Sequence, residues 1–277
     1  MGRFDANPSS GWVQFTNATA VSLSFITPMD MSDPSTSLEA RKIALPIRLE
    51  SPIYPSDLDV FYSVTNVSGN AADFVEFSGT YSFPEISSNS ISQFTRSIEM
   101  FVKPSVLAVA QDADIVFDVT ITGTSKGDIS AGVSDGIRPV TKRVTIKLCQ
   151  VAIASSYSAV STALLATPAA APAWTPDFSN PVVGQTNRWQ LPTCWGNNFV
   201  PFLTGNPNNV FPYPGFLQIN ANNTVTITGI NSAQFPNRYP GGTGTFNPCT
   251  KVISYRLSQG LFANPFQVDV VMTPVAN

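Results

Sequence analysis

Apolar and polar residues alternate with a period of two along much of the first 150 residues, a pattern typical of β-strands that bury one face. Prolines, glycines, asparagines and serines separate the runs, and no segment has the helical period. We therefore expect an all-β fold, with residues 1–150 forming an immunoglobulin-like antiparallel sandwich. The eight expected strands are centred on residues 12–15, 21–25, 43–49, 60–64, 80–83, 98–102, 115–121 and 144–148.

The remaining residues also favour strands, but with longer loops rich in aromatic residues and proline. Strands are expected at 215–219, 224–230, 251–257 and 266–273, with a turn at 220–223. A glycine turn is expected at 241–244, because the lysine and helix of a phosphate-binding loop are missing. The alanines of 152–174 favour helix, which is the main alternative to an all-strand second half.

Charge is distributed unevenly along the chain. Residues 1–150 contain 11 basic and 16 acidic residues, whereas residues 151–277 contain 4 basic and 2 acidic ones. The change coincides with a Ser/Ala/Pro-rich stretch that begins just after Gln150. We therefore expect two domains, a sandwich at 1–150 and a smaller, aromatic-rich antiparallel β domain at 151–277.

The composition excludes several classes of function. The chain has no histidine, the usual general base and the commonest neutral metal ligand, and only 12% of its residues are charged. A net charge of -3 disfavours nucleic acid, which requires clustered Lys and Arg. No apolar run is long enough to span a bilayer. We expect no nucleic-acid partner, no membrane span and no cofactor.

Carboxylate chemistry is also poorly supported. A glycosidase needs two carboxyl groups across a cleft. The second half contains only Asp177 and Asp269, far apart in sequence, and the sandwich pattern of the first half leaves no insertion that would shape a cleft. We therefore expect that the protein is not an enzyme.

The aromatic loops of the second half suggest a binding site for a neutral glycan. Sugar rings pack on aromatic faces, while amide and guanidinium groups bond their hydroxyls. Polar positions here are mostly Asn, Ser, Thr and Gln, which suit a neutral ligand. The alternative is that the rings form the domain core, and ring exposure decides between the two. The candidate binding residues are Trp195, Asn197, Phe211, Tyr213, Phe235, Arg238 and Tyr239.

Several segments resemble a known family. The segments DANPSSGWVQF, IALPIRLESP, DLDVFYSVTNVSG and FVEFSGTYSFP are similar to the Calx-beta-like domain of Bacteroidota cell-surface lipoproteins. The segments NRWQLPTCWGNNF, NNTVTITG and GTGTFNPCTKVISYRLSQGLFANPF resemble the small β domain that follows it. The resemblance implies export, a lipid anchor on a cysteine absent from this chain, and display at the cell envelope, on the outer-membrane surface.

The same resemblance implies an accessory role beside outer-membrane glycan uptake systems, and it brings no catalytic residues. The favoured function is therefore an accessory protein that binds a neutral glycan. The alternative is a structural or scaffold subunit of an outer-membrane or cell-surface protein complex.

Calcium is where the chain departs from other Calx-beta domains, which bind the ion through several carboxylates at one end of the sandwich. Calcium requires six to eight oxygen ligands. Asp112 and Asp114 lie two residues apart, before a strand, where they could share one end of the sandwich with Asp57, Asp59 or Asp135. We expect these carboxylates to be solvated and to keep the strand ends from pairing, so no metal site is predicted.

Three cysteines, Cys149, Cys194 and Cys249, leave at least one thiol unpaired. An exported protein permits a disulfide. We expect a Cys194–Cys249 bridge within the second half, with Cys149 free. The alternative is a bridge between Cys149 and Cys194.

Overall fold

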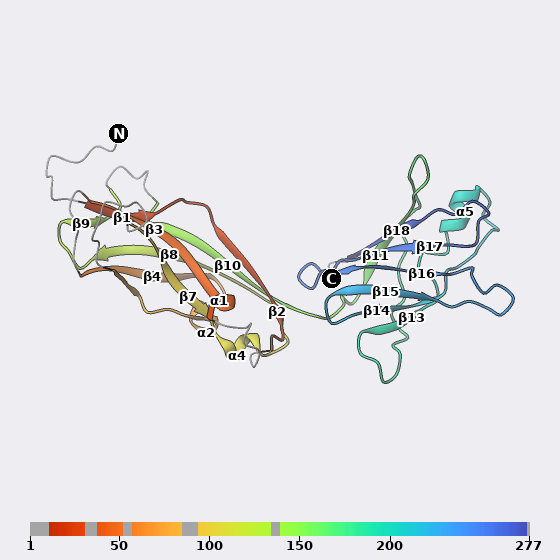
Figure 1. Cartoon of the computed structure of the whole chain (residues 1–277), viewed down its shortest axis with the longest axis horizontal. Helices are drawn as coiled ribbons and strands as arrows, with labels where there is room; N and C mark the ends of the chain where they lie inside the picture. Colours follow the sequence, from red (N-terminus) through yellow and green to blue (C-terminus); the bar gives the residue numbers. More distant parts are fainter. Residues whose placement is uncertain (1–10, 31–37, 52–56, 85–93, 134–138, 276–277) are drawn as a thin grey trace. The chain divides into compact units, whose positions relative to one another are not determined.

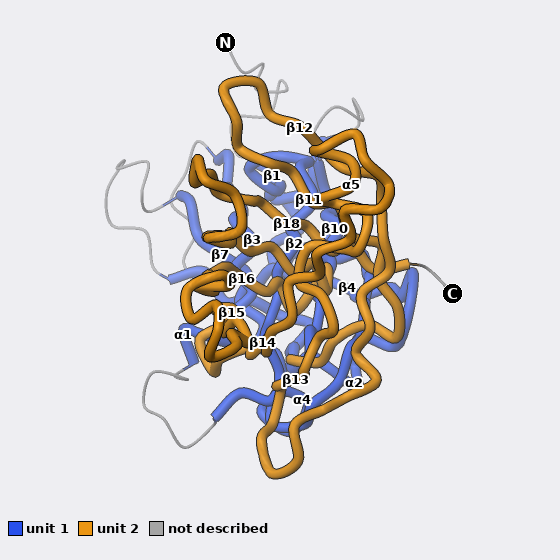
Figure 2. The backbone as a smooth tube through the Cα atoms, turned by 90° about the vertical axis from the view of Figure 1, so that its right-hand side faces the viewer, with its two compact units in different colours: residues 1–150 blue, residues 151–277 orange. Residues whose placement is uncertain are grey.

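The computed structural model describes residues 11–30, 38–51, 57–84, 94–133 and 139–275. The chain divides into two compact units, unit 1 (Met1–Gln150) and unit 2 (Val151–Asn277), which are coloured separately in Figure 2. The division falls where the charge distribution of the sequence changes.

Unit 1 consists of two five-stranded sheets (Figure 1). The first has the order β5-β7-β3-β1-β9, with β1 (Gly11–Phe15), β3 (Lys42–Glu50), β5 (Val75–Glu76), β7 (Thr95–Val102) and β9 (Ile129–Ala131). The second has the order β2-β10-β8-β4-β6, with β2 (Val21–Thr27), β4 (Leu58–Ser68), β6 (Thr80–Phe83), β8 (Ala113–Thr124) and β10 (Thr141–Gln150). All eight predicted strands are present, and β5 and β9 are too short for alternation to reveal them.

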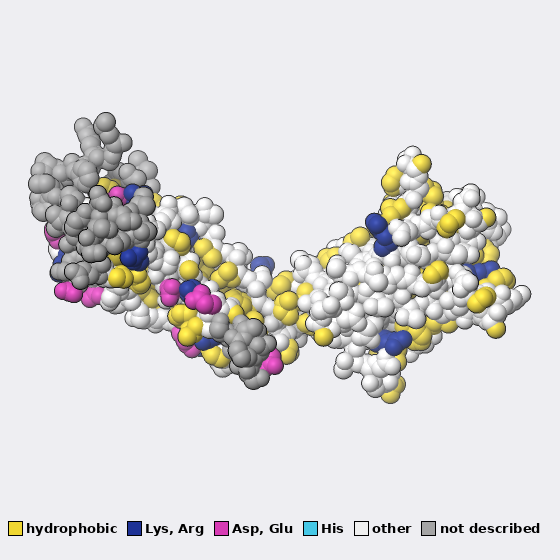
Figure 3. Space-filling view, in the orientation of Figure 1, with side chains coloured by type: hydrophobic (Ala, Val, Ile, Leu, Met, Phe, Trp, Pro, Cys, Tyr) yellow, Lys and Arg dark blue, Asp and Glu magenta, His cyan; other side chains and the backbone are white. Residues whose placement is uncertain are grey.

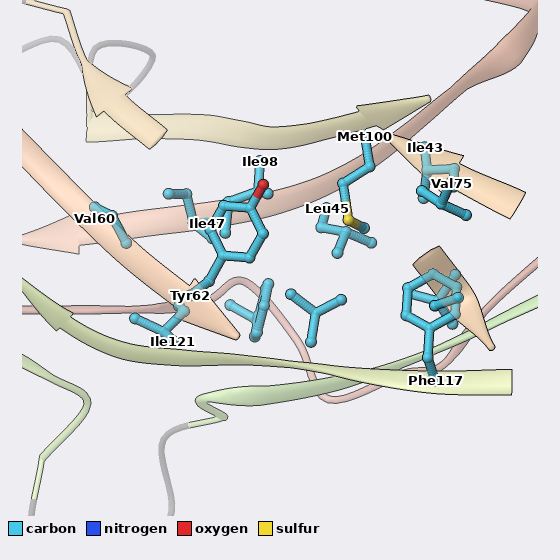
Figure 4. Close-up of a cluster of buried hydrophobic side chains, with 14 of the residues drawn as sticks. Ile43, Leu45, Ile47, Val60, Tyr62, Val75, Ile98, Met100, Phe117 and Ile121 are labelled. Carbon is cyan, nitrogen blue, oxygen red and sulfur yellow. The ribbon is translucent and has the colours of Figure 1, made fainter. Parts of the chain in front are cut away.

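The core of unit 1 lies between its two sheets. Figure 4 shows Ile43, Leu45 and Ile47 of β3 together with Tyr62 of β4 and Phe117 of β8. These side chains belong to one buried cluster, to which both sheets contribute residues. Every second residue of a strand points to the same face, so the alternation in the sequence translates directly into this shared core. Most pairings are antiparallel as expected, but β1 pairs with β9, and β2 with β10, in parallel.

Unit 2 contains a single eight-stranded sheet with the order β12-β11-β18-β17-β16-β15-β14-β13. All its pairings are antiparallel. From β13 to β18 each strand pairs with the next in the sequence, and β18 then pairs with β11. The strands are β11 (Tyr157–Ala163), β12 (Ala169–Ala170), β13 (Arg188–Leu191), β14 (Gly215–Ile219), β15 (Thr224–Gly229), β16 (Gly241–Phe246), β17 (Ile253–Ser258) and β18 (Val268–Pro274).

Two parts of unit 2 differ from what local sequence suggests. The glycine turn predicted at 241–244 is wrong, because these residues begin strand β16 in the interior of the sheet. A Cβ atom on Gly242 or Gly244 would lie 2.0 or 1.9 Å from a carbonyl oxygen of β17. The glycines therefore permit a close approach of two backbones rather than a reversal of the chain. The alanine-rich stretch likewise forms β11 and β12 instead of helix.

Helix is confined, in the described ranges, to segments of four to six residues: α1 (Leu38–Arg41), α2 (Ala71–Phe74), α4 (Pro104–Leu107) and α5 (Phe199–Thr204). The predicted all-β fold is confirmed. None of these helices is long and apolar enough to cross a membrane.

Candidate functional site

The seven residues predicted to bind glycan divide between the core of unit 2 and its surface. Trp195 and Tyr213 are each 0% exposed. The Trp195 ring centroid lies 4.9 Å from those of Phe199 and Tyr213. The prediction that Trp195 and Tyr213 form a binding platform is therefore wrong, and the alternative in which they are core residues holds for both. In the described part of unit 2 the one helix is α5, of six residues, so these large rings fill much of the volume against the buried face of the sheet.

Hydrogen bonds secure both buried rings. The Trp195 indole donates from Nε1 to the carbonyl oxygen of Phe211 at 2.9 Å. The Tyr213 hydroxyl donates to the carbonyl of Ser258 at 3.0 Å and accepts from the amide of Gly241 at 2.6 Å. Burial raises the pKa of Tyr213, so its hydroxyl remains protonated and neutral. These polar atoms therefore form hydrogen bonds with the backbone of unit 2 and stabilise its fold, instead of facing a ligand.

Tyr239 connects this core to a surface loop. Its ring centroid lies 4.8 Å from that of Tyr213, and its side chain is half-buried. The Asn231 side chain donates to the carbonyl of Tyr239 at 2.9 Å and accepts from its amide at 2.7 Å. The two ends of the segment 231–239 are thus held together by one asparagine. We call this segment the Phe235 loop, and Tyr239 is its anchor.

Two further hydrogen bonds fix the Phe235 loop, one within it and one from Gly260 outside it. The Phe235 amide donates to the Ser232 hydroxyl at 3.2 Å, and the amide of Gly260 donates to the carbonyl of Arg238 at 3.0 Å. A Cβ atom on Gly260 would lie 2.3 Å from the carbonyl oxygen of Asn237, so glycine permits this contact. A loop fixed in this way loses little conformational entropy when it binds a ligand.

An aromatic ring and a cation lie together at the surface of this loop. The Phe235 side chain is 42% exposed, and the Arg238 guanidinium lies 3.9 Å from its ring centroid. Around them is a shallow depression of about 420 Å³, lined by Gln234, Phe235, Pro236, Asn237, Arg238 and Gly260. The depression therefore presents one ring face, two amides and one guanidinium. Asn197 and Phe211 are also exposed, but neither lines it.

A second candidate surface was missed at the level of sequence. The residues of β15 to β18 that point away from the core carry mainly hydroxyl groups, and we call this surface the hydroxyl face. A depression of about 390 Å³ lies on it, with Thr243, Thr245, Ser254, Arg256, Asp269 and Val271 in its lining. The signal was the period-two spacing of threonines in TVTIT and GTGT. The spacing in GTGT did not predict a strand, because this segment overlaps the expected glycine turn.

Arg256 and Asp269 form a bidentate ion pair across β17 and β18 on this face. Arginine Nε and Nη2 donate to the two carboxylate oxygens at 2.6 and 2.8 Å. The guanidinium lowers the pKa of Asp269, so this carboxyl group is ionised at neutral pH. Asp177 also has a lowered pKa, because it accepts hydrogen bonds from Ser179. Neither group has the raised pKa of a general acid.

The predicted disulfide is wrong. Cys194 is a free thiol with no exposed surface, whereas Cys149 and Cys249 are the disulfide-bonded cysteines. Cys194 lies against the buried Tyr255, whose hydroxyl donates to the Cys194 carbonyl at 2.7 Å. Spacing in the sequence cannot reveal that the Cys194 side chain points into the core.

Three of the five acidic residues weighed as calcium ligands have other partners. Asp59 accepts from the Ser82 hydroxyl at 2.6 Å, Asp112 from the Gln150 amide at 2.9 Å, and Asp114 lies 3.5 Å from the Lys147 amine. Asp135 lies outside the described residues. Within the described ranges, no three His, Cys, Asp or Glu side chains are arranged to hold a metal ion.

No protein-family model and no curated protein matches the chain. Among solved structures, a Bacteroides ovatus protein of unknown function has a TM-score of 0.38 and 10% identity, over 96% of this chain and 95% of that one. The lipoprotein BT2262 from Bacteroides thetaiotaomicron has a TM-score of 0.33 and 11% identity, over 77% of this chain and 100% of that one. At such TM-scores neither likeness transfers a fold or a function to this chain.

Proposed function

We propose that this protein is a non-catalytic, exported surface lipoprotein that binds a neutral glycan through the Phe235 loop. The observation that carries the binding role is the exposed Phe235 ring. It lies beside Arg238 and two side-chain amides in a loop that hydrogen bonds hold in place. Aromatic faces contact the C–H surfaces of sugars, and amide and guanidinium groups bond their hydroxyls. Export and the envelope location rest on the resemblance of the sequence to Bacteroidota lipoproteins.

Low charge supports a neutral ligand. Unit 2 has four basic and two acidic residues, and in Figure 3 its visible face is mostly uncharged, with three small basic areas. An anionic ligand requires clustered cations.

A protein partner is the second candidate, supported by a different surface. Phe202, Val210 and Phe211 are 44%, 51% and 38% exposed around α5 and the segment that follows it. Exposed apolar side chains of this size are typical of protein interfaces when they form a patch. These side chains would serve the scaffold role in an envelope complex.

The test is a neutral-glycan array followed by calorimetric titration of the best ligand. Phe235→Ala and Arg238→Ala should each cost about 1–3 kcal/mol of binding free energy, as loss of a central contact does. Phe211→Ala is the matched control, an exposed ring outside the depression, and it should bind normally. Absence of binding to every neutral glycan, or equal losses for Phe211→Ala and Phe235→Ala, would contradict the proposal.

A further inference from the structure

We infer that the hydroxyl face of unit 2 is a second glycan contact, which accommodates an extended neutral polysaccharide rather than a single sugar. The inference rests on the proposed glycan binding and deepens it. It concerns the hydroxyl face on β15 to β18 together with Gln218 on the neighbouring strand β14, and these residues are separate from the Phe235 loop.

The first argument is geometrical. Gln218, Thr226, Thr243, Arg256 and Asp269 face one another in sequence across β14 to β18. Directly opposed residues of paired strands point to the same side of a sheet, so the five side chains form one row. Five strands at about 4.8 Å spacing give the row a length of about 19 Å. That length suits a chain of several sugar rings lying across the strands.

A parallel row reinforces the first. Thr224, Thr245, Ser254 and Val271 face one another across β15 to β18. Thr245, Ser254 and Val271 line the same depression as Thr243, Arg256 and Asp269. Hydroxyl groups both donate and accept hydrogen bonds, which matches the chemistry of sugar hydroxyls. Val271, at 44% exposure, adds an apolar contact for C–H groups.

Charge identifies the class of ligand. Arg256 and Asp269 neutralise each other, and their side chains remain 53% and 36% exposed. The exposed parts of the guanidinium and of the carboxylate can still form hydrogen bonds with ligand hydroxyl groups. The bidentate geometry fixes the positions of both side chains. Apart from Arg256, the basic residue within the described strands β13 to β18 is Arg188, whose guanidinium lies 4.7 Å from the Phe216 ring centroid. A neutral polymer fits this balance better than an acidic one.

Affinity electrophoresis tests the inference on the whole chain, in native gels that contain soluble β-glucan, galactomannan or arabinoxylan. Thr243→Lys places a long charged side chain in the middle of the row, and Arg256→Gln removes the guanidinium. Each should weaken retardation by the bound polysaccharide at least tenfold, which is the effect of losing about 1.4 kcal/mol. Thr243→Ser keeps the hydroxyl group and should bind the polysaccharide as the parent chain does. Addition of 0.5 M salt should leave the binding of the parent chain nearly unchanged.

Thr65→Lys is the matched control, an exposed strand threonine of unit 1, and it should bind normally. The melting temperature of Thr243→Lys should be unchanged, and that of Arg256→Gln should fall only by the small amount that loss of one surface ion pair costs. If Phe235→Ala weakens binding while Thr243→Lys and Arg256→Gln do not, the hydroxyl face is overturned and the proposed function stands. If no glycan of any length binds, both fail. Cross-linking of an envelope protein at position 243 without polysaccharide retardation would assign the face to a protein and overturn the inference.

Discussion

At the scale of single residues, the direction of an aromatic ring separates core from surface. Trp195 and Phe235 both lie in loops of unit 2 with proline and asparagine nearby, yet one is fully buried and the other is 42% exposed. The difference depends on what each ring meets. Trp195 packs on Phe199 and Tyr213, whereas Phe235 meets the Arg238 guanidinium and solvent.

Replacement of Trp195 or Tyr213 by alanine should cost about 3–5 kcal/mol of stability, through lost burial and the cavity that remains. Phe235→Ala should leave the free energy of unfolding nearly unchanged, because much of its ring is already in solvent. Urea unfolding followed by fluorescence measures all three. A stable Trp195→Ala variant would show that the ring is not part of the core.

Alkylation should distinguish the three cysteines. Burial raises the pKa of the Cys194 thiol, so little reactive thiolate forms, and the side chain is inaccessible in the native protein. In the absence of reductant, iodoacetamide should label Cys194 once the protein is denatured and not before. Cys149 and Cys249 should be labelled only after their disulfide bonding has been reduced. Peptide mass mapping reads this directly. Labelling of Cys249 before reduction would refute the assignment.

At the scale of elements, unit 2 depends on the close pairing of β16 with β17. Gly244 lies opposite Tyr255, and a Cβ atom at position 244 would also lie 2.6 Å from the Tyr255 Cβ. Glycine is usually unfavourable in a strand. Here it is required because the partner backbone occupies the space of a side chain.

Gly244→Ala should therefore destabilise the protein by about 1–3 kcal/mol, the usual cost of overpacking. Gly123→Ala is the matched control, since Gly123 also lies in a strand, β8, and a Cβ atom there would meet nothing within 4 Å. Thermal unfolding of the two variants makes the comparison. Equal melting temperatures for the two variants would contradict the prediction, because β16 and β17 would then accommodate the added Cβ atom without loss of stability.

The Arg256–Asp269 pair between β17 and β18 should make a small, pH-dependent contribution to stability. The folded protein lowers the pKa of Asp269, so the unfolded chain takes up a proton first as the pH falls. The contribution is therefore present above the unfolded pKa of about 3.9 and is lost as the pH falls through the lower folded value. Asp269→Asn should be slightly less stable than the parent at pH 7, and the difference should shrink below about pH 4. Melting temperatures from pH 2 to pH 7 would show this, and a constant difference would contradict it.

At the scale of the whole molecule, the described residues form two hydrophobic cores, one in each unit. One contains buried residues from Val13 to Leu148, and the other contains buried residues from Tyr157 to Met272. Each core is enclosed by strands of its own unit. Cooperative unfolding follows the packing of a core, so two cores permit two transitions.

Calorimetry should therefore depart from a single two-state transition. Phe117→Ala should lower the transition of unit 1 and Trp195→Ala that of unit 2, because each ring is buried in a different core. A single transition that both variants shift equally would show that the two cores unfold as one.

Much of the fold could be predicted from the sequence, because strand alternation is a local pattern with a period of two. It located the eight longer strands of unit 1 and, in unit 2, β14, β15, β17 and β18. The tertiary structure alone decided that Gly241–Phe246 is a strand, since the reason is a close approach to β17. It also decided that Trp195, Tyr213 and Cys194 point inward, leaving Phe235 and Arg238 at the surface. The direction of a loop side chain depends on packing partners distant in sequence, which no local pattern contains.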